Sequence, residues 1–162
     1  MKIKIFSIGG TIDKVYFDQL SEYQIGGPSI RDIFGHLTLN FEYEIVSMIR
    51  KDSLDMTEED RRIILDAVRS EPSDRILVTH GTDTMVETAK ALQEAGNKVI
   101  VLTGAMEPAG FKTSDAVFNV GCAVAAVQTL PPGVYIAING RIYRPDEVRK
   151  NRGRGRFKPV GS

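Results

Sequence analysis

The chain has 162 residues, and its 21 lysines and arginines balance its 21 aspartates and glutamates. This length fits a single domain, and 42% hydrophobic with 26% charged residues is typical of a soluble globular protein. These values exclude a disordered, collagen-like or coiled-coil chain, and zero net charge argues against a dedicated nucleic-acid-binding protein. The apolar runs, such as 123–127, are far shorter than the roughly 20 residues that span a bilayer, so we predict no membrane contact.

Short apolar runs alternate with segments of helical periodicity in the first half of the chain. We expect strands at 3–8 and 43–49, a long polar loop at 13–28, and a short helix at 29–36. Thr57 is positioned to cap a further helix, because Glu58, Glu59 and Asp60 follow it and suit a helix N-terminus. On that helix, one face is predicted to carry Ile63, Ile64, Ala67 and Val68.

The second half repeats the alternation. Strands are expected at 75–79, 99–103 and 134–138, with helices at 85–95 and 114–129. Asn139-Gly140 predicts a hairpin turn into a final strand at 141–143. This order predicts an α/β fold with three layers, a largely parallel sheet flanked by helices, flavodoxin- or Rossmann-like, ending in a β-hairpin.

The one cysteine of the chain, Cys122, cannot form an internal disulfide and lies in an apolar stretch, so we interpret it as core packing. The chain also opens with Met1 and a strand-like run instead of a secretory signal segment. Both features favour a cytoplasmic protein.

Small and hydroxylated residues follow three of the predicted strands, at Gly9-Gly10-Thr11, at 80–84 and at 103–105. Because the carboxyl ends of parallel strands meet at one edge of a sheet, these loops should form a pocket lined by Thr11, Thr82, Asp83 and backbone amides. Glycines allow close backbone approach, and the free N–H groups of a helix start suit an oxyanion hole.

Each feature also has a plainer interpretation. The glycine loop lacks the spacing of a dinucleotide or phosphate loop, and alone it indicates a tight turn. His80 ends an apolar strand and is interpreted as structural, and His36 as a surface residue near a helix end. A threonine nucleophile would therefore need a base other than histidine, and the residues alone do not choose which lysine could relay the proton.

Three motifs occur in order at the predicted strand ends: Ile8-Gly9-Gly10-Thr11-Ile12, Thr79-His80-Gly81-Thr82-Asp83-Thr84 and Thr103-Gly104-Ala105-Met106. Together they resemble the bacterial-type L-asparaginase/glutaminase family, and the resemblance runs from Lys2 to about Lys150. It implies hydrolysis of L-asparagine to L-aspartate and ammonia through a threonine acyl-enzyme, with L-glutamine as a second possible substrate. It implies no cofactor and no metal, and no His, Cys or carboxylate cluster at ligand spacing occurs in the sequence.

The same resemblance assigns roles to individual residues. Thr11 matches the nucleophile, and Tyr23 matches the tyrosine that a mobile loop brings to activate it. Thr82, Asp83 and Lys150 match a second catalytic group, in which the aspartate contacts the substrate ammonium. The substrate-binding positions that it implies are Gly10, Ser53, Leu54, Gly81 and Ala105, with Ser53 holding the substrate carboxylate and the Ala105 backbone facing the scissile amide.

The sequence departs from the family pattern in three respects. Members usually have two domains, whereas residues 1–162 correspond to the N-terminal domain alone, without the C-terminal domain that supplies an acidic residue for the substrate ammonium. We therefore expect weaker recognition of the α-amino group. Leu54 stands where many relatives carry a polar residue. Finally, residues 151–162 are strongly basic, and one interpretation makes them, with Lys150, part of a solvated flexible tail; RNA binding by Arg152, Arg154 and Arg156 is a minor alternative.

Two other functions compete with the enzyme. The chain could be a catalytically silent module that binds an amide or amino acid, or an ammonia-producing subunit of an amidotransferase. Under the enzyme hypothesis the resemblance implies a homo-oligomer, a dimer or tetramer, with a small-molecule amide as substrate and no nucleic-acid or membrane partner.

Overall fold

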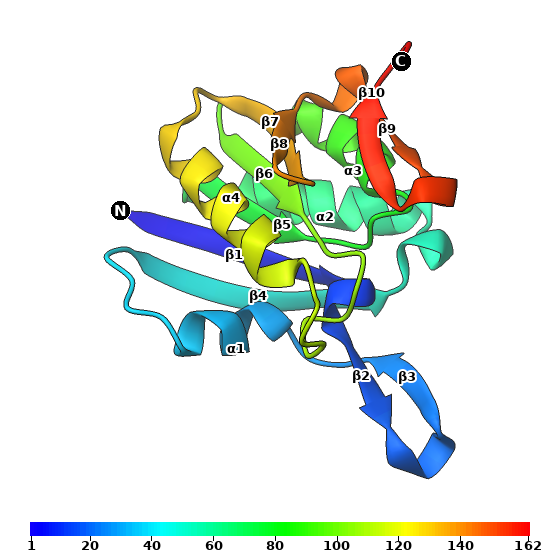
Figure 1. Cartoon of the computed structure of the whole chain (residues 1–162). Coiled ribbons are helices and arrows are strands. Elements are labelled where there is room, and N and C mark those ends of the chain that lie inside the picture. Colours follow the sequence, from blue (N-terminus) through cyan, green and yellow to red (C-terminus); the bar gives the residue numbers. More distant parts are fainter.

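The computed structural model describes all residues from Met1 to Ser162. A six-stranded sheet with the order β4-β1-β5-β6-β7-β8 forms its centre. All neighbouring strands in this sheet are parallel except β7 and β8 (Figure 1). The strands are β1 (Lys2–Gly9), β4 (Glu42–Lys51), β5 (Arg75–Thr79), β6 (Val99–Thr103), β7 (Gly133–Ile138) and β8 (Arg141–Tyr143).

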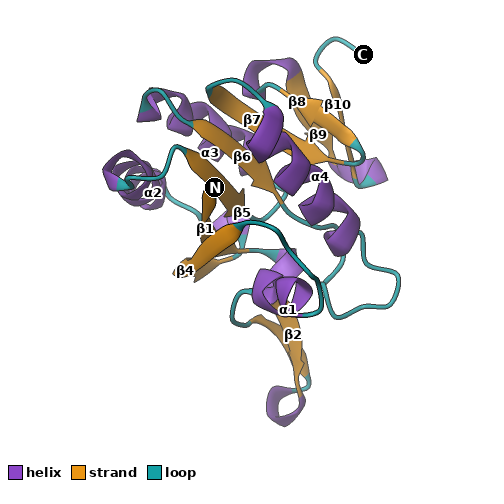
Figure 2. Cartoon of the chain, turned by 90° about the vertical axis from the view of Figure 1, so that its left-hand side faces the viewer, coloured by secondary structure: helices purple, strands orange, loops and turns teal.

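Helices cover both faces of this sheet, which gives the three layers that the sequence predicts. Figure 2 shows α2 (Glu58–Ser70) and α3 (Met85–Leu92) on one side, and α1 (Ser29–Gly35) and α4 (Ala116–Thr129) on the other. Successive strand residues enter opposite cores: Phe6 and Val78 pack with α2 and α3, whereas Ile5 and Leu77 pack with α1 and α4. Burial on both faces explains why the central strands are apolar runs without alternation.

The predicted start of α2 is confirmed. The Thr57 side chain accepts a hydrogen bond from the Asp60 backbone N–H at 3.1 Å, and the Asp60 carboxylate accepts one from the Thr57 N–H at 2.9 Å. This is a capping box. The predicted face needs one correction, because Ile64 and Val68 are buried but Ile63 is 45% exposed.

Two segments contain regular structure where the sequence predicted loop or tail. Within 13–28, β2 (Lys14–Phe17) and β3 (Glu22–Ile25) form an antiparallel hairpin that projects from the body (Figure 1). The segment expected to be a flexible tail forms a second hairpin, β9 (Val148–Asn151) with β10 (Arg156–Pro159), which buries Val148 and Phe157. The strands of the first hairpin are mostly exposed, so no burial pattern marks them in the sequence.

Short 3₁₀ turns lie next to these elements: η1 (Thr11–Asp13), η2 (Asp18–Leu20), η3 (Ser53–Asp55), η4 (Gln93–Ala95), η5 (Pro145–Glu147) and η6 (Arg152–Arg154). No helix of the structure is long and apolar enough to cross a membrane.

Candidate active site

The loops after β1 and β5 meet in direct backbone contact. Gly10 has φ 89°, and a Cβ atom built there would collide with the backbone of Gly81. The loop after β6 makes a similar contact: a Cβ atom built at Gly104 would collide with the carbonyl of His80. Glycine is required at these positions because only it permits such close approach. The predicted convergence of the three strand ends is therefore present in the structure.

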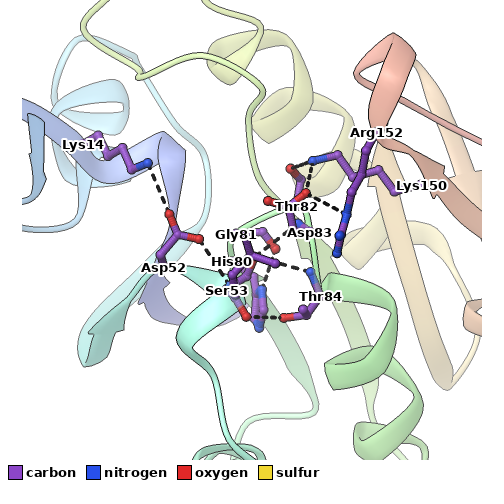
Figure 3. A network of polar contacts seen from close by, with 11 residues as sticks. Lys14, Asp52, Ser53, His80, Gly81, Thr82, Asp83, Thr84, Lys150 and Arg152 are labelled. Carbon is purple, nitrogen blue, oxygen red and sulfur yellow. Dashed lines mark hydrogen bonds and ion pairs between the residues drawn. The ribbon is translucent and has the colours of Figure 1, made fainter.

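Ser53 connects the segment that follows β4 to the same edge of the sheet. It follows β4 in η3 and is 1% exposed. Its hydroxyl oxygen accepts hydrogen bonds from the backbone N–H groups of Asp83 at 3.1 Å and Thr84 at 3.3 Å. The Thr84 hydroxyl in turn donates to the Ser53 carbonyl at 2.7 Å (Figure 3). Ser53 thus fixes the backbone of the Thr82–Thr84 turn while keeping its own proton available for donation.

Thr82, Asp83 and Lys150 form the predicted polar group. The Lys150 ammonium donates to the Thr82 hydroxyl and to the Asp83 carboxylate, both at 2.7 Å, and its side chain is 13% exposed. The Arg152 guanidinium also approaches Asp83, at 3.4 Å (Figure 3). Lys150 lies on β9 opposite Phe157, whose buried ring anchors the hairpin against the body.

Thr11 is the first residue of η1 and is partly exposed. Its hydroxyl has no hydrogen-bond partner within the chain, whereas its carbonyl accepts the Lys14 backbone N–H. Because Gly10 packs on Gly81, the backbone of Thr11 is held close to the turn that carries Thr82. A free hydroxyl at this edge is what a nucleophile requires.

Tyr23 and Leu54 stand apart from this cluster. Tyr23 lies on β3, is 48% exposed, and makes edge contacts with Tyr16 and Phe111 at ring-centroid distances of 5.4 and 5.7 Å. Its hydroxyl bonds to no other group. The Leu54 side chain is 60% exposed, and its backbone N–H donates to the Asp52 carboxylate at 3.2 Å.

Ala105 lies in the loop after β6 and is 1% exposed. The preceding carbonyl, of Gly104, accepts a hydrogen bond from the Asn119 side-chain amide at 2.9 Å. The following N–H, of Met106, donates to the Asp115 carboxylate at 3.0 Å. The backbone on both sides of Ala105 is therefore fixed from α4 and its N-cap.

Asp13 is a buried acid near Thr11 that the sequence analysis did not single out. It is 1% exposed, two positions after Thr11, and accepts hydrogen bonds from the Ser7 hydroxyl and the Ser29 backbone N–H, both at 2.9 Å. Burial raises the pKa of its carboxyl group, although these hydrogen bonds oppose the shift. Its carbonyl also accepts the Gly26 N–H at 2.8 Å, so Asp13 closes the base of the β2–β3 hairpin.

His80 is fully buried, in agreement with a structural role. One ring nitrogen lies 2.7 Å from the Gly81 carbonyl and the other 2.9 Å from the Thr88 hydroxyl, which also accepts from Arg61 at 3.1 Å. A carbonyl can only accept, so the nitrogen that faces Gly81 carries the proton. Desolvation by burial, opposed by that hydrogen bond and helped by the nearby Arg61 charge, lowers the pKa of His80 to about 4.

The site contains no group of three or more His, Cys, Asp or Glu side chains that could hold a metal ion. The charged chemistry at this edge of the sheet is instead that of Asp83 with Lys150 and Arg152, and of Asp52 with Lys14 at 3.2 Å. The second pair ties the start of β2 to the turn that carries Ser53 (Figure 3). It therefore links the projecting hairpin to the site.

Known proteins resemble this chain over most of its length. It is 33% identical over 153 residues to L-asparaginase 2-3 of Saccharomyces cerevisiae, covering 86% of this chain and 42% of that protein. It is 34% identical over 110 residues to a subunit of the glutamyl-tRNA(Gln) amidotransferase of Haloquadratum walsbyi, covering 61% of this chain and 25% of that protein. The chain thus spans less than half of the length of either relative.

Among solved structures, the thermostable L-asparaginase from Thermococcus kodakarensis superposes with a TM-score of 0.88 at 27% sequence identity, covering 100% of this chain and 52% of that one. The sequence model described as "Asparaginase, N-terminal" matches residues 2–157. Fold, site motifs and matched length agree, and the chain belongs to the asparaginase family, through the N-terminal domain of that family.

Proposed function

We propose that this chain is an amidohydrolase that converts L-asparagine to L-aspartate and ammonia through a covalent acyl-enzyme on Thr11. The observation that carries the proposal is the contact of the Lys150 ammonium with both Thr82 and Asp83 at 2.7 Å. A solvated basic tail would not hold its lysine 13% exposed between a threonine hydroxyl and a carboxylate. Membership of the asparaginase family supports the same assignment.

In the first step, the Thr11 hydroxyl oxygen attacks the side-chain carbonyl carbon of the substrate. Its proton passes to a base, and the carbonyl oxygen becomes an oxyanion. The backbone N–H groups of Thr11 and Thr82 are our candidates for stabilising that charge, because the contact of Gly10 with Gly81 holds the two turns together. Loss of one such donor typically costs about 10²–10³ in rate.

Collapse of this intermediate breaks the C–N bond, and the leaving nitrogen departs as ammonia after receiving a proton. The acyl-enzyme that remains is an ester of Thr11. A water molecule then attacks the ester, and Thr82 with Lys150 is the group that we assign to handling its proton. Asp83 keeps Lys150 in place for this step and supplies negative charge for a substrate ammonium.

Tyr23 is the proposed base for Thr11, and it must approach from the hairpin. Lys14 pairs with Ile25 at the base of this hairpin, and Tyr16 pairs with Tyr23 two positions further out. In the proposal, the hairpin bends at its base so that the phenol approaches Thr11, and the same movement excludes water.

For substrate binding, we propose that Ser53 donates its proton to the substrate carboxylate and that Gly10, Gly81 and the Ala105 backbone form the walls of the pocket. Leu54 contributes its exposed side chain at the rim. L-glutamine is the alternative substrate, since one methylene changes binding by only about 1–3 kcal/mol.

Interception by hydroxylamine tests the acyl-enzyme. An ester on Thr11 reacts with hydroxylamine, so the wild-type chain incubated with L-asparagine should form aspartate β-hydroxamate beside aspartate. Thr11→Ala should form neither product, and Thr11→Ser should retain both in reduced amounts. Hydroxamate formation that is unchanged in Thr11→Ala would overturn the assignment of the nucleophile.

A second candidate function rests on the likeness to an amidotransferase component. In that case the site would release ammonia for a partner protein. Ammonia release by the isolated chain would be slow, and it would rise when a chain that co-purifies with it is added. Full activity of the isolated chain would exclude this candidate, and amide binding without any turnover would favour a catalytically silent binding module.

We further propose that residues 1–162 act as one domain of the N-terminal type, that the protein forms a dimer or tetramer of identical chains, and that it resides in the cytoplasm. The half-buried and unpaired Cys122 supports the last point. Sedimentation of the purified chain tests the oligomeric state.

A further inference from the structure

The charges of this neutral chain are strongly segregated. Residues 141–162 carry eight of the 21 basic residues and only two of the 21 acidic residues. Most of these cations lie on the β9–β10 hairpin, which stands beside α3 at the C-terminal end of the chain (Figure 1). Positive charge concentrated on one small element creates a local electrostatic potential that attracts anions.

The hairpin has two different faces. Val148 and Phe157 point into the core and are 2% and 3% exposed. On the opposite face Arg149 pairs directly across the ladder with Lys158. Like charges at directly opposite positions destabilise a strand pair, so this arrangement costs folding free energy in the absence of an anion.

No aspartate or glutamate side chain of the protein neutralises this pair. Ion pairs join Lys150 and Arg152 to Asp83, but none involves Arg149, Arg154, Arg156 or Lys158. The Arg149 guanidinium has one polar contact, a donation at 3.2 Å to a main-chain oxygen of Ser162, the last residue of the sequence, so Lys158 is the cation of the pair without any partner. Lys158 is nevertheless half-buried. A half-buried ammonium without a counter-charge is unfavourable unless a ligand supplies one.

A hollow of about 360 Å³ lies against this face, and it is lined by Arg149, Lys150, Asn151, Arg152 and Lys158. Its lining therefore contains four cations and an amide but no acid. An adjoining hollow of about 370 Å³ shares Arg149, Lys150 and Arg152, and there Asp83 and Glu87 are the acidic residues that face the cations, with Lys90 beside them.

We propose that this hollow is a binding site for a small multivalent oxyanion, either a diphosphate or a tricarboxylate. Arg149 and Lys158 would supply two charges from opposite strands, and Arg152 a third. Guanidinium groups bind both phosphate and carboxylate oxygens in pairs, which fits either source. The hairpin offers no exposed aromatic ring for stacking on bases, because Phe157 is buried, so a small anion fits better than a nucleic-acid strand.

The position of Arg152 connects this site to the candidate active site. The same side chain lines the anion hollow and reaches Asp83 at 3.4 Å. An anion that draws Arg152 toward the hollow would leave Asp83 to Lys150 alone. The proposed anion site does not depend on the proposed amidohydrolase activity, because its evidence is the unpaired charge on the hairpin.

Calorimetric titration of the full chain with pyrophosphate and, separately, with citrate at low ionic strength tests the site. We expect saturable binding of at least one anion. Tighter binding of pyrophosphate would identify the ligand as a diphosphate, and tighter binding of citrate would identify it as a tricarboxylate. Arg149→Gln and Lys158→Gln should each weaken binding by about tenfold or more. Arg62→Gln is the matched control, because this exposed arginine lies on α2 away from the hairpin, and it should leave binding unchanged.

Thermal unfolding supplies a second readout that separates lost binding from lost folding. Without an anion, Lys158→Gln should unfold at a higher temperature than the wild type, because it removes the like-charge pair. With pyrophosphate or citrate, the wild type and Arg62→Gln should gain more stability than Arg149→Gln and Lys158→Gln at the same anion concentration. Absence of binding by both anions would overturn the proposal, as would equal binding by all variants, or binding of a single-stranded oligonucleotide without binding of either small anion.

Discussion

Lys150 and Thr82 are 68 positions apart in the sequence, and the lysine ammonium donates to the threonine hydroxyl at 2.7 Å. The two residues come from β9 and from the turn after β5, and Asp83 binds the same ammonium from the side. The contact depends on the β9–β10 hairpin, which Phe157 anchors in the core. It is the feature that most clearly distinguishes this sheet edge from an ordinary ligand pocket.

Replacing Lys150 by methionine should abolish most of the activity and leave the fold intact. Loss of a group that handles a proton typically costs about 10²–10⁴ in rate. Asp83 would keep Arg152 as a partner, so the protein should still fold, but Lys150 is only 13% exposed and loss of its contacts should cost about 1.5–3 kcal/mol in the free energy of unfolding. Ammonia release by Lys150→Met is the measurement, with the exposed Lys90→Met as control; equal kcat values for the two variants would contradict the assignment.

Tyr23→Phe should lower the activity without lowering the stability of the fold. The phenyl ring retains the edge contacts with Tyr16 and Phe111, and the hydroxyl that is removed has no hydrogen-bond partner. Stability should therefore stay within about 0.5 kcal/mol of the wild type while kcat falls by about 10² or more. Tyr16→Phe, on the facing strand, is the matched control and should keep full activity. If both variants are fully active, Tyr23 is not the base.

Gly10→Ala should damage both the fold and the site. The backbone at Gly10 has φ 89°, and the new methyl group would collide with Gly81, so one of the two turns has to move. We expect a loss of about 2 kcal/mol or more in the free energy of unfolding, together with loss of ammonia release.

Gly121→Ala is the matched control for that substitution. Gly121 lies in α4 with nothing near the new methyl group, and alanine is the better helix former, so stability should rise by about 0.5–1 kcal/mol. Urea unfolding of both variants gives the comparison, and an unchanged stability of Gly10→Ala would show that the two turns do not pack as described.

Stability should depend on pH through His80. Its pKa is 6.5 in the unfolded chain and about 4 in the folded protein, so the unfolded state binds more protons between these values. The free energy of unfolding therefore falls as the pH is lowered from 6.5 to 4, by an amount on the order of 3 kcal/mol from this group.

Urea unfolding at several pH values checks this dependence. His80→Gln should lose this part of the pH dependence, and the exposed His36→Gln should keep it. A His80→Gln variant with the same pH slope as the wild type between pH 4 and 6.5 would contradict the lowered pKa.

Strands β5, β6 and β7 could be predicted because each is an apolar run bounded by small or polar residues, and β5 and β6 have the predicted bounds. Strand β8 was predicted from the Asn139-Gly140 turn that precedes it. The two hairpins could not be predicted, because their strands have only four residues each: those of β2–β3 are mostly exposed, and those of β9–β10 each bury a single side chain. Phe157 illustrates this point, since nothing in a basic segment shows that one aromatic ring is only 3% exposed and packs in the core with Val148.

The candidate site, like the fold, was predictable only where it depends on the main sheet. The meeting of Thr11, Thr82 and the Ala105 loop follows from parallel strands that end at one edge of a sheet. The choice of Lys150 among the lysines came only from family resemblance, because the contact requires the hairpin. Asp13 was missed because its partners, Ser7 and Ser29, belong to elements that only the fold brings together.

Ammonia release from L-asparagine by the purified 162-residue chain, wild type beside Thr11→Ala and Thr11→Ser, tests the central claim most directly. The predicted result is turnover by the wild type, none by Thr11→Ala, and a reduced rate for Thr11→Ser, with all three proteins folded. Equal turnover by the wild type and Thr11→Ala would contradict the nucleophile, and absence of ammonia from L-asparagine and L-glutamine with a folded wild type would contradict the amidohydrolase itself.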